Sequence, residues 1–145
     1  MKLMHDDAVS ETYVQKWAAS FSSGTVTETL HFYTKDALLE DIALNRFCRG
    51  HEEIGAYLQL FYDAVPDMRI SARKCLLGPA HAAVHWTWTG TVQGSVPELP
   101  DVAPGTEFSI DGGAILEFAE DGRIARETDY WDTANLLRQF GLLPG

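Results

Sequence analysis

The sequence has few basic residues, few cysteines and no long hydrophobic run. It holds 11 Lys and Arg against 21 Asp and Glu, which gives a formal net charge of −10. Nucleic acids and anionic membranes are bound through clustered basic side chains, so neither is an expected partner. No segment approaches the roughly 18 apolar residues of a membrane span, and the opening MKLMHDDAVS lacks the apolar core of a signal peptide. We therefore expect a cytoplasmic protein.

The motifs of many cofactor- and metal-dependent enzymes are also missing. The chain has no P-loop, no G-x-G-x-x-G, no G-x-S-x-G and no H-E-x-x-H. His81 and His85 have the spacing of zinc ligands on a helix, but on a predicted strand they lie about 13 Å apart. That is too far for them to share one ion without other ligands. Cys48 and Cys75 are expected to be reduced packing residues, with a catalytic thiol as the alternative. The sequence predicts neither a metal nor an organic cofactor.

Helical patterning dominates the first half of the chain and strand patterning the second. Apolar spacing predicts helices over residues 9–21 and 54–65, and Thr25 followed by Glu28 has the pattern of a capping box that starts a short helix. Helices segregated from antiparallel strands predict an α+β fold, organised as a single domain over residues 1–145. The remaining expectations are strands at 37–41, 68–77, 82–91, 106–118 and 123–131, an irregular segment at 42–49, and a last helix through Phe140 capped by Asp132.

The positive signal is a set of carboxylates among aromatic residues. Glu127 and Asp129 are separated by one residue on a predicted strand, so they point to the same face, roughly 7 Å apart. If that face lines an apolar cavity, burial raises the pKa of a carboxyl there and lets it exchange protons near neutral pH. A solvated strand face is the alternative. Asp41 ends an apolar strand, and the simpler interpretation of Asp41 is a turn residue.

Large aromatic side chains are available to enclose such a cavity. Most of them are expected to be plain core, with two or three lining the pocket. His85 alternates with Trp86 along the same predicted strand, so it should lie outside the cavity. The aromatic residues considered are Trp17, Phe21, Tyr57, Trp86 and Trp88.

Several stretches resemble a known superfamily. The run FYTKDALLEDIALNRFCRGHEEIGAYLQLFYDAVPD resembles the nuclear-transport-factor-2-like proteins. The later WTWTGTVQG, PGTEFSIDGGAILEF and DGRIARETDYWDTANLLRQFGLLP are similar to the SnoaL-type polyketide cyclases. The resemblance extends from about Trp17 to the end of the chain. It implies a cone-shaped, curved antiparallel sheet wrapped by helices around an apolar pocket, a short C-terminal helix, and a homodimer, which we expect to form through the outer sheet face.

The resemblance also implies a cofactor-free reaction, the intramolecular aldol closure of a polyketide ring. The family's acid/base aspartate falls on Asp129, and the family histidine two positions earlier is replaced by Glu127. A neighbouring negative charge should raise the pKa of one of these carboxyls. The implied site has Asp129 and Asp41 as catalytic residues, and Trp17, Phe21, Tyr57, Trp86 and Glu127 binding a hydrophobic, polyketide-like or other carbonyl substrate.

Two other activities of the superfamily fit less well. The proton-shuttling aspartate of ketosteroid isomerases falls on Asp41, but their two oxyanion donors fall on Trp17 and near Ala114, so steroid isomerisation is not expected. Limonene-type epoxide hydrolases need an Arg-x-Asp pair that the strand AAVHWTWTG lacks. The sequence thus predicts a cyclase- or isomerase-type enzyme, with a non-catalytic small-molecule-binding or dimerisation domain as the alternative. Which of Asp129, Asp41 and Glu127 carries the proton stays open.

Overall fold

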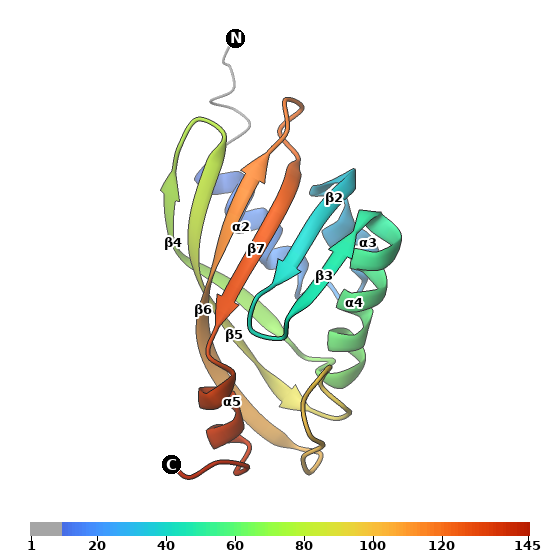
Figure 1. Ribbon diagram of the computed structural model, residues 1–145, viewed down its shortest axis with the longest axis vertical. Helices are drawn as coiled ribbons and strands as arrows, with labels where there is room; N and C mark the ends of the chain where they lie inside the picture. The colour runs from blue at the N-terminus through green and yellow to red at the C-terminus, as the bar shows by residue number, and fades with distance from the viewer. Residues whose placement is uncertain (1–9) are drawn as a thin grey trace.

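The computed structural model describes residues 10–145, in which helices alternate with strands early and long strands dominate later. Helix α2 passes behind the long strands, and α4 stands beside β3 at the edge of the sheet (Figure 1). The elements in chain order are α2 (Glu11–Ser20), α3 (Val26–Leu30), β2 (Tyr33–Asp41), β3 (Arg46–Arg49), α4 (Gly50–Ala64), β4 (Arg69–Leu77), β5 (His81–Val92), β6 (Thr106–Phe118), β7 (Ile124–Trp131) and α5 (Thr133–Gln139).

The strands form one curved, open, six-stranded sheet in the order β3-β2-β7-β6-β5-β4. This arrangement confirms the predicted α+β architecture. All neighbouring pairs are antiparallel except β2 and β7, which are parallel. The expectation of a purely antiparallel sheet was therefore wrong at this one pair. The two strands come from opposite ends of the domain, and so long a connection leaves them free to run in the same direction, which a tight hairpin would not.

The early elements differ in detail from the sequence prediction. Ser10 caps α2, while the predicted helix start at Val9 lies outside the described residues. Thr25 caps α3, but its hydroxyl accepts from the Thr27 N–H at 3.2 Å, so the expected bond to the third helical residue is not the one formed.

The segment 42–49 was predicted to be irregular, which is wrong for its second half. Strand β3 pairs there with β2, and Asn45, in the left-handed region with φ 54°, lies in the turn between them. Only Cys48 of β3 is buried, so the strand lacks the apolar alternation that would have revealed it. Strand β2 also starts earlier than predicted, at Tyr33.

The core lies between the concave face of the sheet and the two longer helices, α2 and α4. Helix α2 contacts β4 and helix α4 contacts β2, so the helices cover opposite ends of that face. Each helix buries one apolar side against the sheet, and this removal of apolar surface from water is the main stabilising contribution. The buried apolar residues of the two helices are Val14, Trp17 and Ala18 of α2 and Ile54, Tyr57, Leu58, Phe61, Tyr62 and Ala64 of α4.

A glycine on β6 makes room for a tryptophan on the neighbouring strand. Gly112 is the register partner of Trp86 on β5. A Cβ atom at Gly112 would lie 2.4 Å from the Cη2 atom of the Trp86 indole, closer than packed atoms can approach. The missing side chain therefore leaves room for the Trp86 indole on the concave face.

The convex face of the sheet carries exposed apolar side chains. Leu76 is 63%, Ile115 39% and Tyr130 51% exposed. They border one shallow groove together with Lys74 and His85. Such a contiguous patch is typical of a surface that pairs with another protein. Within residues 10–145, no helix has the length and apolar character needed to cross a bilayer.

We predict that Gly112→Ala lowers the free energy of unfolding by about 1–3 kcal/mol, the usual cost of overpacking. Gly113→Ala is the matched control, because a Cβ atom there would lie 3.6 Å from the Val84 carbonyl oxygen, an ordinary contact. Urea denaturation of both variants measures the difference. Equal stabilities of the two variants would contradict the proposed packing of Trp86.

The homodimer stays a prediction. We expect light scattering to give twice the 16.1 kDa mass of the chain at micromolar concentration. Ile115→Lys places a charge in the convex groove and should shift the protein to monomer. Leu142→Lys changes a comparably exposed residue after α5 and should leave the dimer intact. A wild-type protein that is wholly monomeric would rule the prediction out.

Candidate functional site

A cavity of about 80 Å³ opens between the concave face of the sheet and the helices α2 and α4. Every residue that the sequence predicted for the site borders it, although their roles stay a prediction. Aromatic rings make up half of its lining. The lining residues are Trp17, Phe21, Tyr57, Phe61, Trp86, Trp88 and Trp131, the carboxyls Asp41, Glu127 and Asp129, and the aliphatic residues Leu39, Leu58, Met68 and Ile70.

The parallel pairing of β2 with β7 brings the three carboxyls together. Asp41 is the register partner of Asp129, and Leu39 that of Glu127. Paired residues on neighbouring strands point to the same face, and the strands lie about 4.8 Å apart. Asp41, Asp129 and Glu127 therefore occupy adjacent positions on the concave face. The interpretation of Glu127 and Asp129 as a solvated strand face does not hold.

Glu127 is the most deeply buried of the three carboxyl residues, with only 3% of its surface exposed. It accepts a hydrogen bond from the Tyr33 hydroxyl. Tyr33 is fully buried and accepts in turn from the Trp17 indole N–H at 2.9 Å. Tyr33 was not predicted as a site residue, because the strand was predicted to begin at Ala37. The exposed Lys35 and Asp36 interrupt the apolar alternation between Tyr33 and Ala37, so the local pattern carries no signal for Tyr33.

The pKa values of Asp129 and Glu127 are both raised, and two such neighbouring carboxyls favour holding one proton between them. Burial raises the pKa of Asp129 well above its ordinary value, and the charge of Glu127 and a hydrogen bond to it raise that pKa further, against a smaller opposing effect of Trp86. Burial also raises the pKa of Glu127, but hydrogen bonds from Asp129 and Tyr33 oppose that rise by stabilising the carboxylate. The shared proton therefore belongs on Asp129, and Glu127 is the charged partner.

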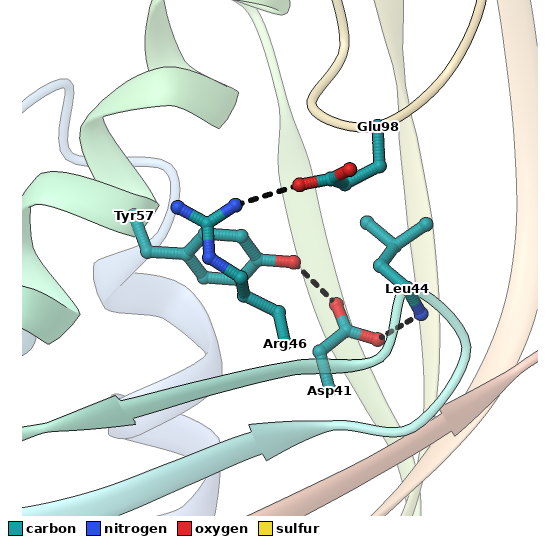
Figure 2. Close-up of polar contacts among 5 residues, drawn as sticks. All are labelled: Asp41, Leu44, Arg46, Tyr57 and Glu98. Atoms are coloured by element: carbon teal, nitrogen blue, oxygen red, sulfur yellow. Dashed lines mark hydrogen bonds and ion pairs between the residues drawn. The ribbon is translucent and has the colours of Figure 1, made fainter.

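Asp41 is both a turn residue and a cavity residue, so its two interpretations are compatible. It is 5% exposed and accepts hydrogen bonds from the Tyr57 hydroxyl at 2.9 Å, the Trp131 indole at 3.0 Å and the Leu44 amide at 3.3 Å. Figure 2 shows the bonds from Tyr57 and Leu44. Burial raises the pKa of Asp41, and these three hydrogen bonds oppose the rise. Burial and the charge of Asp41 raise the pKa of Tyr57, which remains a neutral donor.

The cations nearest the site are engaged elsewhere. Arg46 lies over the Tyr57 ring, 4.9 Å from its centroid, and pairs with Glu98 at 2.8 Å (Figure 2). Arg126 pairs with Glu40 at 3.1 Å rather than with Asp129. Of the residues that the structure describes, no Lys or Arg lines the cavity.

One buried donor at the cavity has no acceptor. Among residues 10–145, the Trp88 indole N–H is the single buried side-chain polar atom without a hydrogen-bond partner. Such an atom costs free energy unless something bonds to it, so a buried N–H on a cavity residue is a candidate donor to a ligand.

His85, as expected, lies outside the cavity and contacts Asp111 at 3.1 Å. The described part of the chain holds no group of three or more His, Cys, Asp or Glu suited to binding a metal ion.

We predict that Asp129→Asn gains stability relative to the wild type as pH rises. A raised pKa means that the folded protein binds this proton more tightly than the unfolded chain, so the wild type loses stability above the ordinary carboxyl pKa of about 4, until the folded-state pKa is passed. Asparagine cannot ionise, and its amide can still donate to Glu127. Urea denaturation at a series of pH values from about 4 upward measures the difference.

Asp111→Asn is the control for this experiment. Hydrogen bonds from Thr87 and His85 lower the pKa of Asp111, so the stability that Asp111 contributes is lost only below the ordinary carboxyl pKa of about 4. The difference between Asp111→Asn and wild type should therefore stay nearly constant above that pH. A difference between Asp129→Asn and wild type that stays constant with pH would contradict the assignment of the proton.

The sequence of this chain matches a known protein family. The SnoaL-like domain matches residues 14–127, which includes Glu127 and ends before Asp129. No curated protein sequence matches the chain closely enough to indicate a relative.

Solved structures share the fold at low identity. One is a protein with a ketosteroid isomerase-like fold from Catenulispora acidiphila, in complex with trimethylamine, at 19% identity and a TM-score of 0.78, covering 92% of this chain and 95% of that one. A protein named as a hydroxylase from Streptomyces galilaeus has 17% identity and a TM-score of 0.79, and the match covers 97% of this chain and 89% of that one. One named as a polyketide cyclase from Xanthomonas campestris has 21% identity and a TM-score of 0.75, and the match covers 94% of this chain and 98% of that one. This chain belongs to the SnoaL-like family.

Proposed function

We propose that this protein is a cofactor-free cyclase- or isomerase-type enzyme that moves protons on a small carbonyl compound. The observation that carries the proposal is the pair of carboxyls in the aromatic cavity, Asp129 with its raised pKa and Glu127 held by Tyr33. Perturbed carboxyls that share a cavity are the arrangement expected of acid–base catalysis. Membership of a family that includes polyketide cyclases supports the same class of reaction.

In the proposed mechanism, Asp129 acts as the acid. Its O–H donates a proton to the substrate's carbonyl oxygen while a carboxylate removes the α-proton, which leaves an enol on the substrate. Asp41 is placed to be that base, because it is the register partner of Asp129 and its hydrogen bonds favour the carboxylate. In a cyclase, the enol carbon then attacks a second carbonyl of the same molecule. In an isomerase, it is reprotonated at another carbon.

The cavity limits the size of this substrate. An apolar cavity of about 150 Å³ holds a benzene molecule, and this one measures about 80 Å³. A large fused polyketide would therefore require the aromatic side chains to move, whereas a compound of a few heavy atoms fits between them. The unpartnered Trp88 N–H offers a hydrogen bond to a substrate oxygen.

A non-catalytic small-molecule-binding domain is the second candidate. The neighbours named as a hydroxylase and as a polyketide cyclase share one fold, so the fold leaves the reaction open. The neighbour from Catenulispora acidiphila is in complex with a small amine, which favours a binding role for a cavity of this kind. Loss of turnover on removal of a proton-carrying group separates the two functions.

We predict that Asp129→Asn lowers kcat by about 10²–10⁴, the usual contribution of a general acid or base. The assay uses a panel of small β-dicarbonyl and keto compounds, followed by NMR for proton exchange at the α-carbon. Asp41→Asn should also lower the rate, and by less if Asp41 only anchors the substrate. Glu117→Gln is the control, because Glu117 is half-buried and pairs with Arg126 outside the cavity. Turnover by Asp129→Asn at the wild-type rate would refute the assignment.

A further inference from the structure

Three carboxyls line the cavity, and among residues 10–145 no basic side chain lines it with them. The pKa of both Asp129 and Glu127 is raised, chiefly by burial, so their ionised forms are costly without a positive partner. Burial raises the pKa of Asp41, and its hydrogen bonds from Tyr57, Trp131 and Leu44 oppose that rise by stabilising the carboxylate. Buried charges are normally paired with an opposite charge, yet in the described chain no Lys or Arg borders this cavity. A ligand with a positive charge would supply the missing partner.

The walls of the cavity are suited to an organic cation. Four indole rings line it, together with Tyr57, Phe61 and Phe21. Neighbouring rings stand nearly perpendicular, at 88° for Trp17 and Phe21 and 81° for Trp88 and Trp131, so the walls consist of rings in several planes. Aromatic faces attract ammonium groups, most strongly where water is excluded.

A separate observation favours an oxygen on the same ligand. Trp88 is 5% exposed, lines the cavity, and keeps its indole N–H without a partner in the described chain. A cation cannot accept that hydrogen bond, but a carbonyl oxygen can. The small volume of the cavity requires both groups to lie within a few heavy atoms of each other.

We infer that the cavity binds a small aminocarbonyl compound, with its ammonium group among the carboxyls and aromatic rings and its carbonyl oxygen on the Trp88 N–H. This assignment names the substrate class of the site described above and rests on the proposed function only for the chemistry that follows binding. The binding itself can be measured without turnover.

Three probes of equal size separate the contribution of the ammonium group from that of the carbonyl group. Glycinamide carries an ammonium group and a carbonyl, propionamide replaces the ammonium with a methyl group, and isobutylammonium replaces the amide with two methyl groups. Calorimetry at neutral pH should show glycinamide binding at least about tenfold more tightly than propionamide, because a desolvated cation gains both ring and carboxylate contacts. Equal affinities, or no binding of glycinamide, would overturn the inference.

Two substitutions test the residues that carry the inference. Asp41→Asn should weaken binding of both ammonium probes several-fold, whereas Glu40→Gln, which removes an equal charge from the adjacent residue paired with Arg126, should not. Trp88→Phe keeps an aromatic ring but removes the donor. It should weaken glycinamide about three- to tenfold, as expected for one hydrogen bond, and leave isobutylammonium unchanged.

The outcomes for ligand class and for catalysis can be told apart. If Asp41→Asn and Glu40→Gln bind the ammonium probes alike, the cation site is wrong. If Trp88→Phe weakens both ammonium probes equally, the position of the carbonyl is wrong. Neither result depends on turnover, so the ligand class can stand while the acid–base role of Asp129 fails, and the reverse.

Discussion

The parallel pairing of β2 with β7 is the constraint on which the site depends. It joins strands from opposite ends of the domain and makes Asp41 the neighbour of Asp129 on the concave face. A shift of one residue in this register would turn one set of carboxyls to the opposite face, because side chains alternate along a strand. The pairing is fixed from both sides, since β3 extends the sheet beyond β2 and β6 lies beyond β7.

The carboxyls keep their unusual chemistry because the surrounding packing excludes water from them. Trp86 lies over Gly112, and Trp17 reaches the carboxyl pair through the Tyr33 hydroxyl. These large side chains reduce the free volume and the local polarity together. In such surroundings an ionised carboxyl is costly, so the pair retains a proton that two solvated carboxyls would lose. The same packing that stabilises the fold therefore sets the acidity of Asp129.

Asp41 and Glu127 show how hydrogen bonds divide roles among similar side chains. Each is buried, and each accepts a hydrogen bond from a tyrosine: Asp41 from Tyr57 and Glu127 from Tyr33. Asp129 has no tyrosine donor among its described hydrogen bonds and is the member whose charged form is least stabilised. Three carboxyls in one SnoaL-like cavity thus differ in proton affinity because of their donors rather than their burial alone.

Local patterns in the sequence determined most of the elements. The limits of β6 were predicted as observed, the Asp132 cap of α5 is confirmed, and period-two alternation put Glu127 and Asp129 on one face. These features depend on near neighbours. Only the tertiary structure decided that this face is the concave one, that β2 runs parallel to β7, and that Tyr33 reaches Glu127, 94 positions away in sequence. Such contacts depend on how distant strands pair and how side chains fill the space between layers, which a local pattern of residues does not encode.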